Sequence, residues 1–266
     1  MPTTEFAFQD LCTLMGRRIR PEEVKDSISM LGVDVERIDS EKIVMEVFPN
    51  RPDMLGIEGF ARALKGVMGI DSGLTEYQTE DSGIKLYVES SVKDVRPYIS
   101  AGVVRDVSLT EERLVSLMNI QEKLHITHGR NRKKVAIGVH DLSKVTPPFT
   151  YKAAGPEEIS FVPLDTCVRM TLSEILKRHP KGTAYAGILK GFSKYPVILD
   201  RNGEVLSFPP IINGERTRLS GTTKEAFIDV TGTDRKAVDS AMSILVAGLL
   251  DRCGRACSVE ILEGNC

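Results

Sequence analysis

Residues 206–234, LSFPPIINGERTRLSGTTKEAFIDVTGTD, combine short β-prone runs with a Pro-Pro break and a glycine-containing loop. Just upstream, Asn202-Gly203 separates the β-prone run 197–199 from the run 205–208, and Asn-Gly between such runs predicts a β-hairpin. Pro209-Pro210 cannot donate backbone hydrogen bonds, so the second strand should end before them. The stretch therefore predicts a sheet interrupted by an irregular loop, which is typical of a pocket wall.

Residues 227–231 predict a further strand whose polar side chains share one face. Side chains alternate along a strand, so Asp229 and Thr231 point to one side and Ile228 and Val230 to the other. A carboxylate and a hydroxyl are thus expected on one surface. Spacing alone favours a simpler interpretation, in which Ser207 and Thr231 decorate a solvated sheet face and Asp229 caps a turn.

Two longer stretches carry a resemblance to a known family. SFPPIIN (207–213) with FIDVTGTD (227–234) resembles the tRNA-editing domain in the beta subunit of phenylalanyl-tRNA synthetase, archaeal/eukaryotic type. VFPNRPDMLGIEGFARALKG (47–66) resembles the N-terminal part of the same subunit, and VRPYI, KVAIGVHDL, PPFTYKA, ISFVPL and HPKG fit between them. Because two long, unusual motifs in the right order are more specific than one short pattern, the chain is identified as a member of this family.

The expected fold class is α+β, with two domains. Residues 1–80 should form a small N-terminal α/β domain of the beta subunit, and residues 81–266 a larger, mixed-sheet tRNA-editing domain. Residues 69–83 are rich in Gly, Ser, Thr and acidic side chains without periodicity, which predicts a linker. Apolar spacing predicts helices at 57–68 and 235–250, the second capped by the polar residues just before it.

Composition limits the other possibilities. The chain has 266 residues, 41% of them hydrophobic, and a net charge of −2, so a nucleic-acid partner would need a local basic patch. No segment has the length of a membrane span or the pattern of a signal peptide, and we expect a cytoplasmic protein. An odd number of scattered cysteines argues for reduced thiols and against a disulfide framework or a metal site. The cysteines are Cys12, Cys167, Cys253, Cys257 and Cys266.

The densest positive charge lies in Arg130, Arg132, Lys133 and Lys134. Such a run is commonly a solvated loop. In a protein that handles tRNA it can also contact phosphates without reading sequence, so we assign these four residues to tRNA binding as a hypothesis.

His140-Asp141 is a second charged motif. Consecutive strand residues face opposite sides of a sheet, so these two side chains should not form an acid–base pair. Nucleotide hydrolysis, zinc proteolysis and α/β-hydrolase chemistry have no support either, because the motifs G-x-x-x-x-G-K-[ST], H-E-x-x-H and G-x-S-x-G are missing from the sequence.

The resemblance implies hydrolysis of mischarged tyrosyl-tRNA(Phe). It points to Ser207, Asp229 and Thr231 as catalytic residues, and Asp229 could bind the substrate ammonium, bind the phenol or orient water. No base is evident near Ser207, so attack by a positioned water is favoured over a covalent intermediate. The alternative is a non-catalytic RNA-binding or subunit-assembly module that retains the editing fold. The candidates for substrate binding are Leu199, Asn213 and Glu215.

The resemblance also implies partners. Beta subunits of this family join alpha subunits in a heterotetramer that attaches phenylalanine to tRNA(Phe) with ATP and Mg²⁺. The present chain ends soon after the editing domain, so we expect a fragment that itself needs no cofactor or metal. Neither a membrane nor DNA is an expected partner.

Overall fold

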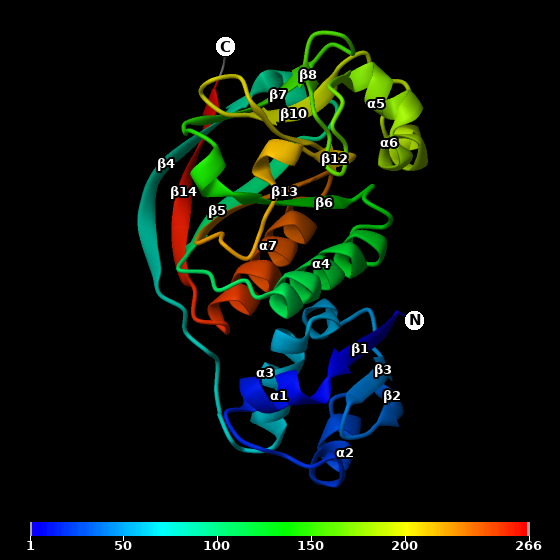
Figure 1. Ribbon diagram of the computed structural model, residues 1–266, viewed down its shortest axis with the longest axis vertical. Coiled ribbons are helices and arrows are strands. Elements are labelled where there is room, and N and C mark those ends of the chain that lie inside the picture. Colours follow the sequence, from blue (N-terminus) through cyan, green and yellow to red (C-terminus); the bar gives the residue numbers. More distant parts are fainter. Residues whose placement is uncertain (1, 265–266) are drawn as a thin grey trace.

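The computed structural model describes residues 2–264, which form a three-stranded sheet, a nine-stranded sheet, a two-stranded ribbon and packed helices (Figure 1). In the labels, η marks a short 3₁₀ helix. The N-terminal elements are β1 (Thr3–Ala7), α1 (Phe8–Met15), α2 (Pro21–Ser29), β2 (Asp34–Ile38), β3 (Lys42–Glu46), η1 (Pro52–Leu55) and α3 (Ile57–Val67).

The rest of the chain builds the nine-stranded sheet and its surroundings. Its first elements are β4 (Thr79–Glu89), η2 (Ser90–Val92), β5 (Tyr98–Arg105), α4 (Glu111–Ile126), β6 (Val135–Asp141), η3 (Leu142–Lys144) and β7 (Phe149–Ala154). The next are β8 (Ser160–Phe161), β9 (Met170–Thr171), α5 (Leu172–Arg178), α6 (Pro180–Tyr185), η4 (Ala186–Ile188), β10 (Tyr195–Leu199) and β11 (Val205–Phe208). The last are β12 (Ile212–Asn213), η5 (Glu215–Thr217), β13 (Glu225–Gly232), α7 (Arg235–Leu250) and β14 (Arg255–Gly264).

The large sheet is mixed, with the strand order β12-β11-β10-β7-β4-β14-β5-β13-β6. Strand β4 runs parallel to β14 and to β7, whereas the pairs β13–β5 and β13–β6 are antiparallel. One buried cluster contains both Leu206 of β11 and Phe227 of β13, which lie near opposite ends of this order. The sheet therefore curls, and its concave face encloses a core.

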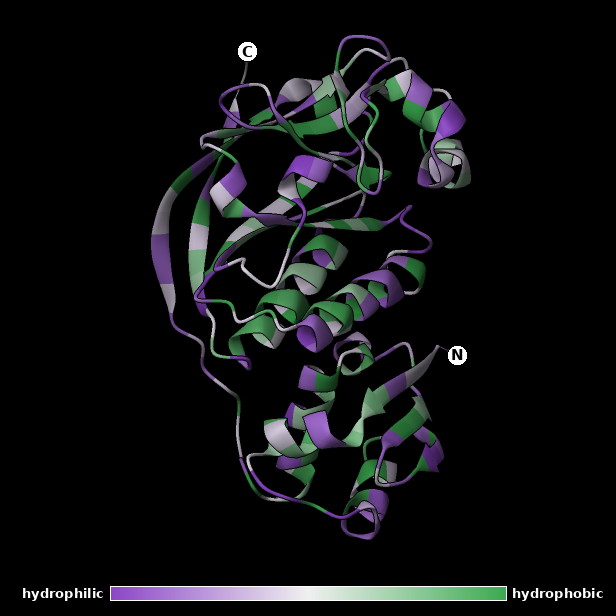
Figure 2. Cartoon of the chain, viewed as in Figure 1, coloured by the Kyte–Doolittle hydropathy of each residue, from purple (hydrophilic) through white to green (hydrophobic). Residues whose placement is uncertain are grey.

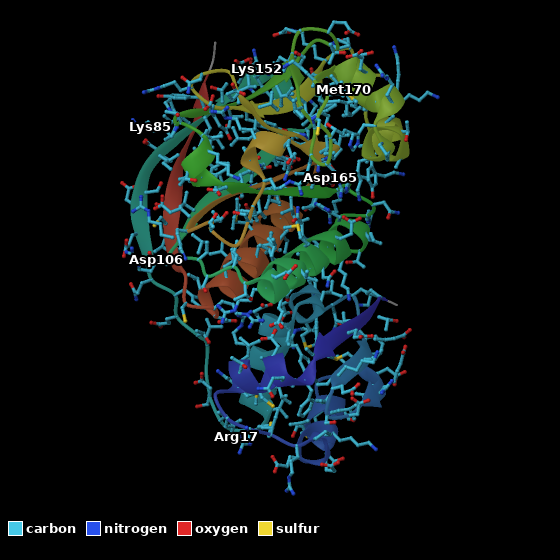
Figure 3. The ribbon with its side chains drawn as sticks, viewed as in Figure 1. Arg17, Lys85, Asp106, Lys152, Asp165 and Met170 are labelled. Atoms are coloured by element: carbon cyan, nitrogen blue, oxygen red, sulfur yellow. The ribbon has the colours of Figure 1, made fainter. Side chains whose placement is uncertain are left out.

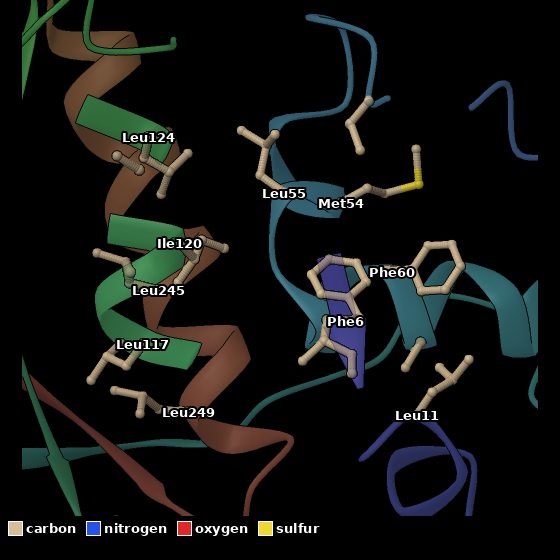
Figure 4. Packing of buried hydrophobic residues seen from close by; sticks show 14 of the residues in the cluster. Phe6, Leu11, Met54, Leu55, Phe60, Leu117, Ile120, Leu124, Leu245 and Leu249 are labelled. Carbon is tan, nitrogen blue, oxygen red and sulfur yellow. The ribbon is translucent and has the colours of Figure 1, made fainter. Parts of the chain in front are cut away.

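A second core lies on the outer face of β13 and continues into the N-terminal part of the chain. Ile228 and Val230 of β13 belong to it, together with residues of α4, α7 and α3. In Figure 4, Phe6 and Leu55 face Ile120 of α4, with residues of α7 beside it. The hydrophobic colouring of α7 in Figure 2 agrees with this burial. Helices α4 and α7 thus lie between the large sheet and the N-terminal elements (Figure 1).

A buried arginine reinforces this junction. Arg252, whose side chain is 7% exposed, donates two hydrogen bonds to the carboxylate of Asp10, at 2.6 and 2.7 Å. Its Nε donates to Glu58 at 2.9 Å. Residues more than 190 positions apart in the sequence are therefore linked by charge as well as by apolar packing.

The predicted α+β class with a large mixed sheet is confirmed, as are the hairpin and the helices at 57–68 and 235–250. Strands β10 and β11 pair antiparallel, and β11 ends at Phe208, directly before the two prolines. Asp234 caps α7 by accepting a hydrogen bond from the Ala237 amide at 2.8 Å. The predicted linker 69–83 is wrong at its end, because residues from Thr79 onward pair with β14. The domain boundary at residue 80 stays a prediction.

Three further observations concern residues 2–264 only. None of their helices combines the length and hydrophobicity needed to cross a membrane. No group of three or more His, Cys, Asp or Glu side chains is placed to hold a metal ion there. Cys12, Cys167, Cys253 and Cys257 are free thiols, as predicted, whereas Cys266 lies outside the described residues.

Candidate active site

The two ends of the large sheet meet at a pocket of about 100 Å³, which we call the seam pocket. Cavities of about 150 Å³ hold benzene, so its scale is that of one ring-sized group. Strands β6 and β13 form one wall of the pocket, and β11 and β12 form the other. The lining residue Asp165, which is labelled in Figure 3, marks the position of the pocket in the molecule. Its lining residues are Gln121, His125, Arg132, Ala136, Ile137, Gly138, Leu164, Asp165, Lys181, Ser207, Phe208, Pro209, Pro210, Ile211, Ile212, Asn213 and Asp229.

Asp229 brings a carboxylate to this pocket from the middle of β13. It is 1% exposed, and its Oδ1 lies 2.7 Å from Nε2 of His140 on the neighbouring strand β6. A carboxylate oxygen accepts, so Nε2 carries the hydrogen of this bond. The other ring nitrogen of His140 lies 2.8 Å from the hydroxyl of Thr217. The carboxylate is thereby held in place by a buried imidazole.

Gly138 leaves the space for this pair. It is the residue of β6 directly opposite Asp229. A Cβ atom on Gly138 would lie 2.3 Å from Asp229 Oδ1 and 2.5 Å from His140 Nε2, closer than any real contact. Glycine is therefore required here by the approach of the two side chains and not by backbone conformation.

Three polar atoms of the seam pocket are buried without a hydrogen-bond partner. They are Ser207 Oγ, Gln121 Oε1 and Arg132 Nε, and within residues 2–264 only one other buried side-chain atom, Arg105 Nε, shares this property. Arg105 Nε lies 3.1 Å from a Glu225 carboxylate oxygen and so has a charged neighbour. Buried polar atoms are normally paired, and leaving one unpaired costs about 1–3 kcal/mol. Their convergence on one cavity indicates a place for a polar ligand.

Arg132 reaches the pocket from an unusual turn. Arg130, Asn131 and Arg132 have φ values of 50°, 52° and 66°, a left-handed conformation that is uncommon outside glycine. The turn directs Arg132 inward, where it donates to the carbonyl of Ile211 at 2.9 Å and to Glu122 at 2.9 Å.

These contacts correct the interpretation of the basic run. Arg132 is 9% exposed and its guanidinium also stacks over Tyr185, so it is not a surface contact for RNA phosphates. Lys134 forms an ion pair with Asp234 at 3.2 Å. Arg130 and Lys133 are exposed, and for them the tRNA-binding hypothesis stays a prediction.

Two side chains of α4 satisfy the free edge of β6. Gln121 donates to the carbonyl of Ile137 at 2.9 Å, and His125 Nε2 accepts from the Ile137 amide at 2.8 Å. Burial lowers the pKa of His125 to about 4, so the ring is neutral at pH 7. The hydrogen bond with His125, and then the Arg132 charge, hold the pKa of Glu122 well below its ordinary value.

Thr231 lies next to the seam pocket without lining it. It is fully buried, and its hydroxyl accepts a hydrogen bond from Nε of Arg96 at 2.9 Å, while its carbonyl accepts from the same guanidinium at 2.7 Å. Burial lowers the pKa of Arg96 to about 10, and the guanidinium remains charged at pH 7. Thr231 therefore does not offer a free hydroxyl to a ligand; it fixes a buried positive charge near Asp229.

Of the three predicted substrate-binding residues, one lines the seam pocket and two do not. Asn213 of β12 pairs with Ser207 and lines the pocket. Leu199 ends β10 and packs with an apolar cluster, and it is not among the lining residues. Glu215 is also outside the lining and forms two hydrogen bonds with Arg218, which hold its pKa below the ordinary value.

Gln121, His140 and Arg96 also belong to this region, although they are not among the site residues predicted from the sequence. A signal existed for Gln121, because it lies one helical turn from both Leu117 and Leu124 on the buried side of α4, where a polar residue is out of place. For His140, the prediction that Asp141 is not its partner is confirmed: Asp141 accepts from Ser143 and Thr223 instead. We find no such signal for Arg96.

Comparison with known proteins places the chain in a family. A model of the B3/4 domain matches residues 110–245. The phenylalanine–tRNA ligase beta subunits of Methanococcoides burtonii and Archaeoglobus fulgidus are 45% and 49% identical to it, each over 262 residues, 98% of this chain. Those matches cover 48% and 47% of the relatives, so the chain spans about half of their length.

A solved structure agrees along nearly the whole chain. It is an N-terminal fragment of the phenylalanyl-tRNA synthetase beta-subunit from Pyrococcus horikoshii, with a TM-score of 0.93 and 38% identity over 98% of this chain and 77% of that one. Sequence and fold thus lead to the same conclusion: the chain belongs to the phenylalanyl-tRNA synthetase beta-subunit family, in which it corresponds to the N-terminal region with the B3/4 domain.

Proposed function

We propose that this chain edits tRNA(Phe) by hydrolysing the ester of mischarged tyrosyl-tRNA(Phe) with a positioned water. The observation that carries the proposal is the set of unpaired, buried polar atoms of Ser207, Gln121 and Arg132 around one ring-sized pocket beside the Asp229 carboxylate. A purely structural module would gain stability by pairing or removing such atoms.

The need for this reaction follows from the size of the selectivity problem. Tyrosine differs from phenylalanine by one hydroxyl, and an apolar pocket rejects an added hydroxyl only weakly, by about a hundredfold. A second site can discriminate far better if it hydrogen-bonds that hydroxyl. Phenylalanine in such a site would leave buried polar atoms unpaired, at about 1–3 kcal/mol each.

The seam pocket offers both kinds of hydrogen-bonding group. Ser207 Oγ–H and Arg132 Nε–H can donate, and Gln121 Oε1 can accept, so a hydroxyl placed among them would pair with atoms that have no partner among residues 2–264. Apolar walls from Phe208 and Ile211 surround these groups. The combination favours a ligand that is aromatic in body and polar at its tip.

Asp229 is the group we assign to the water. Its Oδ1 is occupied by His140, and no hydrogen bond of Oδ2 is found among residues 2–264. That oxygen can accept a hydrogen bond from a water and direct the lone pair of the water at the ester carbonyl carbon. The water proton passes to Asp229 and from there to the ribose oxygen as the bond between the carbonyl carbon and that oxygen breaks, which releases tyrosine and free tRNA. Among residues 2–264 no base lies within hydrogen-bond distance of Ser207 Oγ, so we assign Ser207 to binding and not to nucleophilic attack.

We further propose the setting that the family implies. The complete beta subunit would join an alpha subunit, and the assembly would attach phenylalanine to tRNA(Phe) with ATP and Mg²⁺. The editing step assigned here needs none of these groups. Hydrolysis of an ester by water requires only the tRNA and the residues of the seam pocket.

The direct test is to incubate the chain with tyrosyl-tRNA(Phe) and to compare wild type with Asp229→Asn. We expect the variant to lose about two orders of magnitude in rate, which is a typical contribution of a positioned general base. Asp71→Asn removes a carboxylate from an exposed position and serves as a matched control with wild-type activity. If wild type hydrolyses no faster than Asp229→Asn while still binding tRNA, the non-catalytic RNA-binding alternative holds instead.

A further inference from the structure

The segment from α5 to the start of β10 carries a concentration of positive charge outside the basic run 130–134. Residues 172–194 contain five Lys or Arg and one Glu, a local charge of +4 in a chain whose net charge is −2. All five cations are exposed. They are Lys177, Arg178, Lys181, Lys190 and Lys194.

Two of these lysines flank a concave site, which we call the lysine hollow. It has a volume of about 420 Å³, and its lining includes Lys177 of α5, Lys190 after η4, and the hydroxyl-bearing Ser173 and Tyr195. The ion pairs of the segment within residues 2–264 are Arg178 with Glu174 and Lys181 with Glu122. Lys177 and Lys190 therefore keep uncompensated charges on either side of a hollow.

Two exposed glycines are among the residues that line the hollow. Gly187 and Gly191 both line it, and a Cβ atom on either would meet no other atom within 4 Å. Backbone amides that are not covered by side chains can donate to phosphate oxygens, and Tyr195 supplies an aromatic ring of the kind on which bases stack. The hollow thus combines three features of a site for a nucleic-acid strand: fixed positive charge, open backbone and an aromatic ring.

The hollow and the seam pocket are joined by one continuous segment. Lys177 lies in the hollow, and Lys181, four residues later, lines the seam pocket. Helix α6 is anchored beside that pocket, because Lys181 lies 3.7 Å from Glu122 and Tyr185 stacks with Arg132 at 4.6 Å. A strand bound in the hollow could therefore follow exposed cations to the mouth of the seam pocket.

We propose that the lysine hollow binds backbone phosphates of the tRNA whose aminoacyl ester enters the seam pocket. This inference rests on the proposed function for the identity of the RNA. Lys177 and Lys190 act as phosphate contacts that set the register of the strand and carry no sequence specificity. The segment 172–194, and not the run 130–134, is then the main electrostatic docking surface.

Filter binding of uncharged tRNA(Phe) at salt concentrations from 50 to 200 mM tests the proposal with the double variant Lys177→Gln/Lys190→Gln. Each phosphate contact to single-stranded RNA contributes about 0.7 to the slope of log affinity against log salt. When salt rises from 50 to 200 mM, the affinity of each protein falls by some factor. Because two contacts are lost, that factor should be about seven times smaller for the variant than for wild type. The control Lys25→Gln/Lys236→Gln removes the same charge from exposed lysines elsewhere and should keep the wild-type slope.

Equal slopes for wild type and the hollow variant would overturn the proposal, as would an equal change in the control. Uncharged tRNA has no ester, so the result is independent of hydrolysis. A chain that binds tRNA through the hollow but leaves tyrosyl-tRNA(Phe) intact refutes the proposed function alone. A chain that hydrolyses tyrosyl-tRNA(Phe) while the hollow variant keeps its salt slope refutes the hollow alone.

Discussion

Replacing Gly138 by alanine should disable the candidate active site with a single methyl group. The new Cβ would lie 2.3 Å from Asp229 Oδ1 and 2.5 Å from His140 Nε2, whereas ordinary contacts begin at 3.4 Å. Each of the two atoms must therefore retreat by roughly 1 Å, which separates a hydrogen bond that is now 2.7 Å long. A displacement of about 1 Å at a reacting group typically costs about a hundredfold in rate.

The assay is single-turnover hydrolysis of tyrosyl-tRNA(Phe). We expect the rate constant of Gly138→Ala to fall by about a hundredfold, equivalent to about 3 kcal/mol in the barrier. Thermal unfolding should show a smaller loss, about 1–3 kcal/mol, because the methyl group overpacks a buried site. His140→Ala removes the same hydrogen bond without adding bulk and should lose activity to a similar degree.

A matched glycine separates this effect from a general response to alanine. Gly102 lies on β5, in the same sheet, and a Cβ there would meet its nearest atoms at 3.7 Å or more. Gly102→Ala should therefore keep wild-type hydrolysis. A folded Gly138→Ala protein with the wild-type rate would refute the role of the His140–Asp229 pair.

Three more predictions follow from individual contacts. Ser207→Ala removes a buried hydroxyl that has no partner among residues 2–264, so urea unfolding should show unchanged or higher stability. The activation free energy for hydrolysis of the tyrosyl ester should rise by about 1–3 kcal/mol relative to that of the phenylalanyl ester. Reduced stability of the variant would contradict this prediction. Thr231→Val leaves Arg96 Nε without its hydrogen-bond acceptor, so we expect a loss of about 1–3 kcal/mol in unfolding free energy. Wild-type stability would argue against the buried contact. His125 is buried with a folded-state pKa of about 4, below its ordinary 6.5, so the unfolded chain binds the proton first and stability falls from pH 6.5 to 4 by about 3 kcal/mol. Denaturation curves of His125→Gln across that pH range should show a decline in unfolding free energy that is smaller by about this amount. An equal decline in wild type and variant would contradict the lowered pKa of His125.

Local patterns were sufficient for much of the fold. Asn202-Gly203 predicts the hairpin because its turn geometry is set by two residues, and Pro209-Pro210 end β11 because they lack donors. Alternation along β13 correctly separates Asp229 from Ile228, which belongs to the outer core. Each of these features depends on neighbours in the sequence.

The assembly of the pocket depends on contacts that no local pattern contains. His140 meets Asp229 across 89 residues, and the match requires β6 and β13 to be adjacent in the sheet. The basic run predicts that Arg132 contacts tRNA phosphates, but carbonyl acceptors 78 and 79 residues away hold its side chain inside the protein. The unpaired state of Gln121 Oε1 also emerges only when the helix, the turn and both sheet ends are in place.

In the proposed function, the polar atoms of Ser207, Gln121 and Arg132 recognise the hydroxyl of tyrosine. Calorimetric titration of the chain with two non-hydrolysable adenosine amides, one carrying tyrosine and the other phenylalanine, tests this recognition. They differ by one hydroxyl, and each hydrogen bond to it should contribute about 1–3 kcal/mol, so we predict that the tyrosyl amide binds at least about tenfold more tightly. Equal affinities, or a preference for the phenylalanyl amide, would contradict the claim.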